Sequence, residues 1–295
     1  MKPIPKLLTL VLVATAATSA FAQWPRYPAR GLPTGADGKI NLDAPVPRTA
    51  DGKPDLAGVW ELGPCIECPA RGRGGAGGAA PPPPPPARGA AGTGELPPGG
   101  GNPFGNIGIG VQGGAPYQPW AGELVKRRMA DNSKDNPDAH CLPMGVAQLN
   151  SHPYPRKIIQ TPSEILIIYE GSGTTVREIF MDGRPLPKDP EPWWNGYSIG
   201  RWEGDTLVVE TTGFMDDGWL DVRGSPLTSG AKLIERYRRV RFGYLELEET
   251  FDDPKAYTRP FSARVYYRLS SDTQLIEFVC LDKDAAHYVG AGGAR

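Results

Sequence analysis

The sequence predicts an all-β fold: an antiparallel meander that closes into a barrel or a strongly curved sheet, with one short helix and a long disordered Gly/Pro-rich insertion. From Arg156 onward, apolar and polar residues alternate with the period of two that is typical of strands. The turn sequences GSG, DGR, EGD, RFG and SDT separate these runs. Closing such a meander into a barrel removes its exposed edges, which favours the barrel.

The expected strands follow one another along the chain. They are KIIQT, EILIIYE, TTVREIFM, YSIGRWE, TLVVETTGF, KLIERYRRV, YLELEETF, SARVYYRLS and QLIEFVC. YSIGRWE and TLVVETTGF flank Gly204 and Asp205, a Gly-first loop that suits a type II′ hairpin turn. In this register Arg201 and Glu210 lie on a diagonal, within reach of a salt bridge. We interpret them as an ordinary cross-strand ion pair, with a catalytic role as the weaker alternative.

The region before these strands divides into segments of different composition. Residues 1–22 have the basic start, the short apolar run LLTLVLVATAAT and the small residues at the end of SAFA that are typical of a cleaved signal peptide. The mature chain would start near Gln23 and be periplasmic or secreted, without membrane insertion. Residues 23–69 form an N-terminal arm with a first strand in LAGVWE, and residues 70–117 form the insertion.

The remaining segments complete the expected organisation. Residues 118–284 form the β-barrel domain, which begins with the one expected helix in PWAGELVKRRMAD, and residues 285–295 form a flexible tail. The formal net charge of −1 gives no field that would attract nucleic acid. The sequence has no P-loop, dinucleotide fingerprint or G-x-S-x-G motif, so we expect no cofactor and no serine hydrolase.

Four cysteines in an exported chain predict disulfides. Cys141 and Cys280 lie near the two ends of the β-rich region, so a bridge between them would close a long loop. Cys65 and Cys68 then pair locally or stay reduced. A zinc site made by these two residues with His140 and Cys141 is the alternative. We favour disulfides and expect no metal.

Several motifs resemble those of a large family of uncharacterised exported bacterial proteins. They are SIGRWEGDTLVVETTGF, WLD, ERYRR, DDPKAYTRP, PDLAGVWE, CLPMG, KIIQTP, IYE and REIFMDGRPLP. The resemblance runs from about Asp55 to Cys280, interrupted by the insertion, and implies no settled activity. GVW is also similar, more weakly, to the opening strand of lipocalin-type barrels, which supports a barrel by analogy.

The chain departs from this family at histidine positions. Members usually carry histidine where this chain has Tyr197, Ser225, Leu227 and Leu233. If those histidines bind a metal or shuttle protons in the relatives, that chemistry is lost here.

Carboxylates on the strands are the candidates for catalysis. Glu235 and Tyr237 are two residues apart, so they share one strand face and would point into a barrel mouth. A buried carboxylate there would have a raised pKa and act as an acid or a base, with Tyr237 as a donor. The alternative is a paired network that ties strands together. The further candidate carboxylates are Glu170, Asp182, Glu203, Glu210 and Glu248.

Aromatic and basic residues near the loops are the candidates for ligand binding. EPWWNGY places two tryptophans and a tyrosine in a loop that enters a strand, where they would stack on a sugar or cover an apolar ligand. The alternative is that they fill the barrel end as core. The predicted ligand-binding set is Trp193, Trp194, Tyr197, Trp202, Trp219, Arg177 and Arg184.

These observations leave three hypotheses for function. The first is an exported barrel that binds a small organic or glycan ligand between its loops. The second is a secreted lyase or isomerase that uses Glu or Asp with Tyr and Arg on the same scaffold. The third is a structural envelope protein. A binder needs a roomy interior, an enzyme needs an isolated inward carboxylate, and a structural protein has its interior filled.

Overall fold

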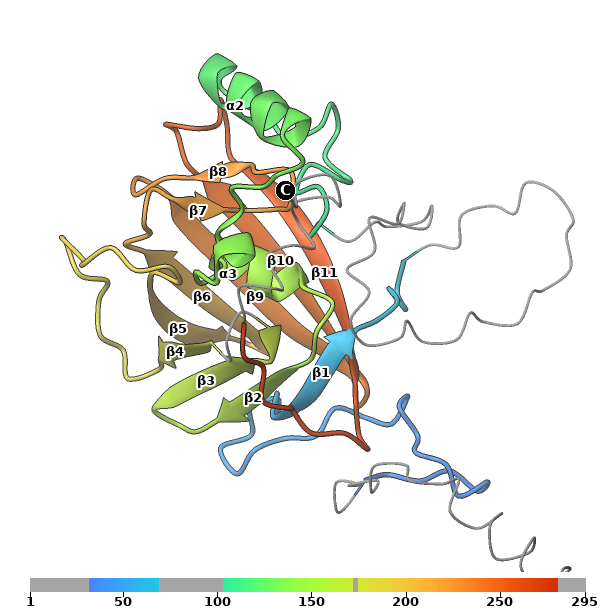
Figure 1. Ribbon diagram of the computed structural model, residues 1–295. Helices are drawn as coiled ribbons and strands as arrows, with labels where there is room; N and C mark the ends of the chain where they lie inside the picture. The colour runs from blue at the N-terminus through green and yellow to red at the C-terminus, as the bar shows by residue number, and fades with distance from the viewer. Residues whose placement is uncertain (1–31, 69–102, 172–174, 281–295) are drawn as a thin grey trace, which may run out of the picture.

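The structure is a computed structural model that describes residues 32–68, 103–171 and 175–280. A closed barrel of nine strands dominates it, in the order β1-β11-β10-β9-β6-β5-β4-β3-β2 (Figure 1). The predicted all-β barrel is therefore confirmed. Its strands are β1 (Gly58–Leu62), β2 (Arg156–Gln160), β3 (Glu164–Tyr169), β4 (Val176–Phe180), β5 (Tyr197–Glu203), β6 (Thr206–Thr212), β9 (Lys232–Arg241), β10 (Tyr244–Asp252) and β11 (Phe261–Leu269). A separate two-stranded sheet consists of β7 (Gly218–Trp219) and β8 (Pro226–Leu227).

The first strand closes the barrel. β1 pairs antiparallel with β11 on one side and with β2 on the other. The expectation that QLIEFVC forms the last strand is wrong, because residues 274–280 contain no strand. The place beside β11 is occupied by β1, so this segment finds no free edge.

One pair of adjacent strands in the barrel is parallel and not antiparallel. β4 and β5 run parallel and share two residue pairs, Ile179 with Ser198 and Phe180 with Ile199. β4 ends at Phe180, whereas β5 continues to Glu203. The last residues of β5 therefore have no partner on β4.

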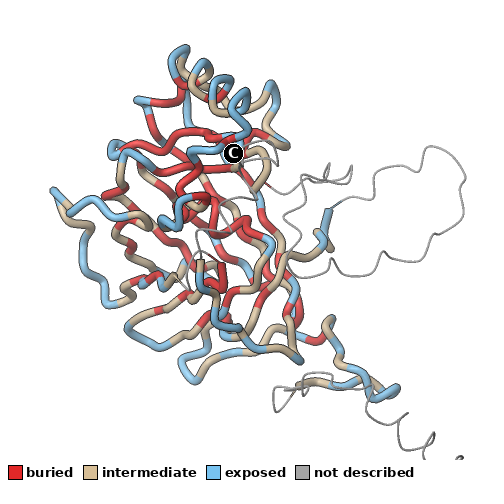
Figure 2. The backbone as a smooth tube through the Cα atoms, viewed as in Figure 1, coloured by how far each residue is buried: buried red, intermediate tan, exposed pale blue. Residues whose placement is uncertain are grey.

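Strand alternation determines which side chains fill the barrel. Along β10 the residues Leu245, Leu247, Glu249 and Phe251 are buried, and their neighbours between them are more exposed. Figure 2 shows buried positions recurring along the strands in this way. The interior is filled by apolar side chains, which include Trp60, Ile158, Ile165, Ile167, Leu207, Leu247 and Val265.

Helices cover one end of the barrel. α2 (Pro119–Ala130) confirms the predicted helix (Figure 1). Pro119 occupies its first turn, where a backbone N–H is not needed. Two further elements were not predicted, a 3₁₀ helix η2 (Pro137–His140) and α3 (Val146–Ser151). All six residues of α3 are buried, because the helix lies over the barrel interior.

The N-terminal arm crosses the opposite end. The backbone N–H of Phe242, in the β9–β10 turn, donates to the carbonyl of Ala44 at 2.8 Å. The Arg48 guanidinium forms two hydrogen bonds to Asp205 in the β5–β6 turn, at 2.9 and 2.7 Å. The arm therefore holds the hairpin turns, and both barrel ends are covered.

Residues 103–117 differ from the predicted insertion. Ile107 is fully buried in a second apolar cluster, and its backbone N–H donates to the Asp221 carboxylate at 2.7 Å. Isolated apolar residues in this glycine-rich stretch, together with hydrogen bonds, therefore hold it against the barrel domain. Residues 70–102 of the predicted insertion, the predicted signal peptide 1–22 and the predicted tail 285–295 lie outside the described residues.

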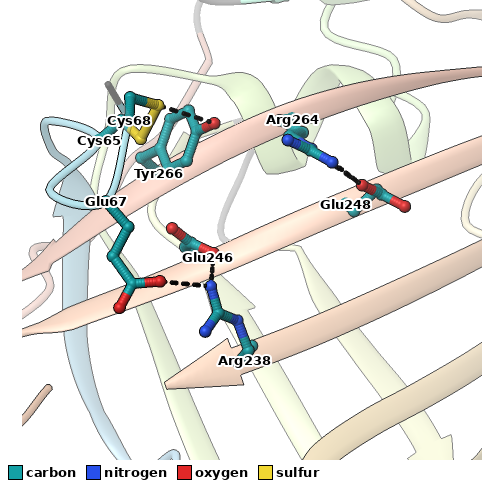
Figure 3. The surroundings of a disulfide bond; sticks show 8 residues. All are labelled: Cys65, Glu67, Cys68, Arg238, Glu246, Glu248, Arg264 and Tyr266. Atoms are coloured by element: carbon teal, nitrogen blue, oxygen red, sulfur yellow. Dashed lines mark hydrogen bonds and ion pairs between the residues drawn. A yellow bond between two sulfur atoms is a disulfide. The ribbon is translucent and has the colours of Figure 1, made fainter. Parts of the chain in front are cut away.

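Two disulfides join the four cysteines. Cys141 pairs with Cys280, as predicted, and Cys65 pairs locally with Cys68 (Figure 3). The zinc alternative is wrong, because all three of its cysteines are in disulfides: Cys65 with Cys68, and Cys141 with Cys280. Disulfides form and persist in oxidising compartments, so these two indicate a location outside the cytoplasm. Among the helices that the structure describes, none has the length and apolar character needed to span a bilayer.

Candidate functional site

The β5–β6 hairpin has the predicted register. Trp202 faces Leu207, and Arg201 faces Val208. On the outer face, an Arg201 nitrogen lies 2.5 Å from a Glu210 oxygen, so the ion-pair interpretation is confirmed. The Arg201 guanidinium is 52% exposed, and it also pairs with Glu203. These charges stabilise the outer face of the hairpin and do not point into the interior.

Glu248 also lies on the outer face. Its carboxylate accepts a hydrogen bond from Arg264 at 2.8 Å, and Glu246 pairs with Arg238 beside it (Figure 3). Of the adjacent glutamates on β10, it is Glu249 that points inward and is fully buried.

A buried polar group, which we call the lumen cluster, consists of Asn150, Arg177, Glu235, Tyr237 and Glu249. Its centre is an ion pair between Arg177 on β4 and Glu235 on β9, with side chains 1% and 0% exposed. Arg177 Nη1 donates to Glu235 Oε1 at 2.8 Å, and Nη2 donates to Oε2. Burial opposes the charge on Arg177, but the Glu235 carboxylate outweighs it and raises the arginine pKa.

Glu235 and Tyr237 share the inward face of β9, as predicted. The Tyr237 hydroxyl donates to Glu235 Oε1 at 2.9 Å. Burial raises the pKa of Tyr237 well above its ordinary value, and the Glu235 charge adds to the effect. Tyr237 is therefore a neutral hydrogen-bond donor.

Asn150 on α3 links the two inward glutamates. Its Nδ2 donates to Glu235 Oε1 at 2.8 Å and to Glu249 Oε1 at 3.0 Å. Its Oδ1 accepts from the Tyr169 hydroxyl on β3 at 2.7 Å. The helix is thus fixed to strands on different sides of the barrel by one side chain.

Glu249 lies directly opposite Glu235 in the β9–β10 register. Burial raises the pKa of Glu249 to about 8, and the nearby Glu235 charge contributes. Within the part of the chain that the structure describes, Glu249 Oε2 has no hydrogen-bond partner although it is buried. The pair thus consists of one ion-paired carboxylate and one carboxyl group that is protonated at neutral pH.

A second buried group lies beside α3. Arg156 on β2 donates to the carbonyls of Asn150, His152 and Tyr154. Burial lowers the pKa of His152 to about 3, and Arg156 contributes to the shift. His152 is therefore a neutral residue that helps to anchor the end of the helix.

Of the other predicted ligand-binding residues, Trp193 and Arg184 both contact Tyr197 at the surface, whereas Trp219 lies apart from them. Trp193 is 55% exposed, and Trp194 and Tyr197 are half-buried in the same loop region. Trp219 is buried, with the Arg128 guanidinium 4.2 Å from its ring centroid. Arg184 pairs with Asp182 on the surface, stacks on Phe180 and contacts the Tyr197 hydroxyl.

Of the four positions at which the resemblance implies histidine in other proteins, Ser225, Leu227 and Leu233 are buried here and Tyr197 is half-buried. The Ser225 hydroxyl donates to Asp221 at 2.8 Å, and Leu227 and Leu233 belong to the second apolar cluster. Within the described residues, no group of three or more His, Cys, Asp or Glu side chains is arranged to hold a metal ion.

A cavity of about 490 Å³ lies at the barrel wall, beside the end of β5 that has no partner on β4. We call it the wall cavity. Its lining comes from residues 49–51 of the arm, residues 160–162 at the β2–β3 turn, Met181 and Gly183 after β4, and residues 200–202 of β5. Trp202 and Met181 are half-buried and pack against the apolar interior from this side. The cavity therefore opens to solvent on one side and borders the interior on the other.

A larger hollow of about 850 Å³ lies outside the barrel. Residues 274–280 form one side, and outward residues of β1, β2 and β3 form the other. The Cys141–Cys280 disulfide and a hydrogen bond from Ile276 N to Glu170 Oε2 hold this segment. It has no link to the lumen cluster.

The chain matches no protein-family model, and no curated protein or solved structure is significantly similar to it.

Proposed function

We propose that this protein is an exported β-barrel protein that binds a small, uncharged, largely apolar organic ligand in the wall cavity. The observation that carries the proposal is the cavity itself, formed between loops where β5 runs past the end of β4. Its volume lies within the range of small-molecule sites, and the half-buried Trp202 offers an aromatic surface. The barrel interior is filled by apolar side chains, so the roomy interior expected of a binder is absent, and the site that we propose is the wall cavity instead.

The polar groups of the cavity favour an apolar ligand over a glycan. The Gln160 amide already accepts from Leu56 N and donates to the Pro54 carbonyl. The Thr161 hydroxyl donates to the Glu164 carbonyl. Arg201 is paired with two carboxylates. A sugar would find few free partners for its hydroxyl groups, whereas an aromatic ring needs none.

Titration with N-phenyl-1-naphthylamine, an uncharged aromatic probe that fluoresces in apolar sites, tests the proposal. We expect saturable binding that falls at least about tenfold in Ala50→Trp, which fills the mouth of the cavity from an exposed position. Trp193→Ala is the matched control, because it removes an exposed tryptophan outside the cavity lining. Two results would overturn the wall-cavity site. One is that the probe does not bind the wild type, and the other is that Trp193→Ala loses binding while Ala50→Trp keeps it.

A further inference from the structure

The wall cavity and the carboxylate pair lie along one row of the barrel. In the strand register, Gly200 on β5 pairs with Val209 on β6, Val209 pairs with Glu235 on β9, and Glu235 pairs with Glu249 on β10. Gly200 is also part of the cavity lining. Since neighbouring strands are about 4.8 Å apart, the backbone of Gly200 is about 10 Å from that of Glu235 and about 14 Å from that of Glu249 along the wall. The Glu249 side chain points into the barrel, so the separation that a ligand has to span is shorter than the distance along the wall.

Flexible side chains separate the cavity from the interior along this row. A Cβ placed on Gly200 would lie 2.5 Å from Met181 Sδ, so the Met181 side chain fills the space that a larger residue would take. Trp202 is the inward residue next along β5, and both residues pack against the interior cluster. Methionine has three rotatable bonds and adapts its shape readily, so its movement opens a path without changing the strands.

The hydrogen-bonding state of Glu249 determines which chemical group of a ligand can bind in the barrel interior. Its Oε1 accepts from Asn150, so in the neutral carboxyl group the hydrogen is on Oε2. Oε2 is fully buried, and the described residues offer it no partner. A buried donor without an acceptor is unfavourable, and a ligand that brings an acceptor removes this penalty.

We propose that the ligand of the wall cavity is a small aromatic or apolar molecule with an uncharged carbonyl group, and that the Glu249 carboxyl group donates a hydrogen bond from Oε2 to that carbonyl. This inference rests on the proposed function and adds the chemical class of the ligand. The apolar body lies at Trp202, and the carbonyl passes Met181 into the interior. The charged groups that act on Glu249 are Glu235, which disfavours a second negative charge, and Arg177 and Arg156, which favour one. Arg177 is paired with Glu235 and Arg156 is bonded to backbone carbonyls, so an uncharged carbonyl is preferred to a carboxylate.

Two uncharged probes separate this inference from the proposed function. N-phenyl-1-naphthylamine has no carbonyl group, whereas 6-propionyl-2-dimethylaminonaphthalene is an aromatic ketone of similar size. In the wild type, affinity for the ketone should fall at least about tenfold between about pH 6 and about pH 10, because ionised Glu249 cannot donate. Affinity for the amine probe should stay constant.

Glu249→Gln is the decisive variant, since its amide is a donor that does not titrate. Ketone binding should be independent of pH in this variant. Met181→Ala should strengthen ketone binding by widening the path. Circular dichroism and thermal unfolding at each pH show that every variant is folded.

The outcomes are distinguishable. If neither probe binds, the proposed function fails together with this inference. If the amine probe binds and the ketone shows no pH dependence, or if Glu249→Gln keeps the pH dependence of the wild type, the carbonyl inference alone is overturned.

Discussion

Glu249 on β10 lies directly opposite Glu235 on β9, and the Asn150 amide donates a hydrogen bond to both carboxyl groups. Two like charges at facing positions of a sheet repel each other. The barrel avoids this repulsion in two ways: Arg177 neutralises Glu235, and a proton neutralises Glu249. The second of these makes the stability of the fold depend on pH.

Glu249→Gln should flatten the stability profile between about pH 6.5 and about pH 8. The pKa of Glu249 is about 8 in the folded protein and 4.5 in its reference state, so the folded state holds a proton that the unfolded state has released. The free energy of unfolding therefore decreases as pH rises towards 8, by up to about 1.4 kcal/mol per pH unit. Urea denaturation of the wild type and the variant at a series of pH values measures the difference.

His152 changes stability with pH in the opposite direction, and it limits the pH range in which the effect of Glu249 is visible. Its pKa is about 3 when folded and 6.5 in its reference state, so stability from this group is lost as pH falls below 6.5. Between pH 4.5 and pH 6.5 the contributions of the two groups to the pH dependence of the free energy of unfolding cancel. Between pH 6.5 and pH 8 only the contribution of Glu249 remains. If the free energy of unfolding of Glu249→Gln runs parallel to that of the wild type between pH 6.5 and pH 8, Glu249 is not the protonated member of the Glu235–Glu249 pair.

Removal of Arg177 should destabilise the protein far more than removal of an exposed arginine. Arg177→Met leaves the Glu235 charge buried without its cation, a change that typically costs about 3–5 kcal/mol. Arg201→Met is the matched control, because its ion pairs are largely exposed and worth about 0–1 kcal/mol.

A double variant tests the reason for this loss. Adding Glu235→Leu to Arg177→Met removes the unpaired charge and should restore part of the lost stability. Equal unfolding midpoints for Arg177→Met and Arg201→Met in urea would show that the buried pair does not stabilise the barrel.

The sequence was most informative where local rules determine the structure. The Gly204–Asp205 turn fixes the hairpin register, so the pairing of Trp202 with Leu207 was predictable. Glu249 was missed, although it has the same parity as Leu245 and Leu247, and that alternation was the available signal. Glu248, the candidate chosen instead, has the opposite parity.

Long-range contacts explain what the sequence did not show. LAGVWE and QLIEFVC both have strand character, and only the assembled barrel decides that the first pairs with β11. The position of Asn150 depends on where α3 lies over the barrel, and no local pattern specifies it. The wall cavity likewise arises from the difference in length between β4 and β5 on one side.

Gly196→Ala should destabilise the protein more than Gly204→Ala. Both glycines have left-handed backbone angles, with φ of 63° and 61°, so both variants lose about 1 kcal/mol from backbone strain. A Cβ on Gly196 would also lie 2.7 Å from the Thr212 carbonyl oxygen, whereas a Cβ on Gly204 meets nothing within 4 Å. We expect the melting temperature of Gly196→Ala to be clearly the lower. Equal melting temperatures of the two variants would mean that the loop before β5 shifts to accommodate the added Cβ at little energetic cost.

The two disulfides should differ in their contribution to stability. In the chain-entropy model, a bridge across a sequence separation of 139 stabilises by about 5 kcal/mol, and one across 3 residues by about 2 kcal/mol. Cys141→Ser with Cys280→Ser should therefore lower the free energy of unfolding more than Cys65→Ser with Cys68→Ser. Denaturation in urea of both double variants measures the difference, with the oxidised wild type as the reference. A larger loss for the Cys65–Cys68 variant would show that this local bridge holds the end of β1 in the barrel, an effect that loop length does not describe.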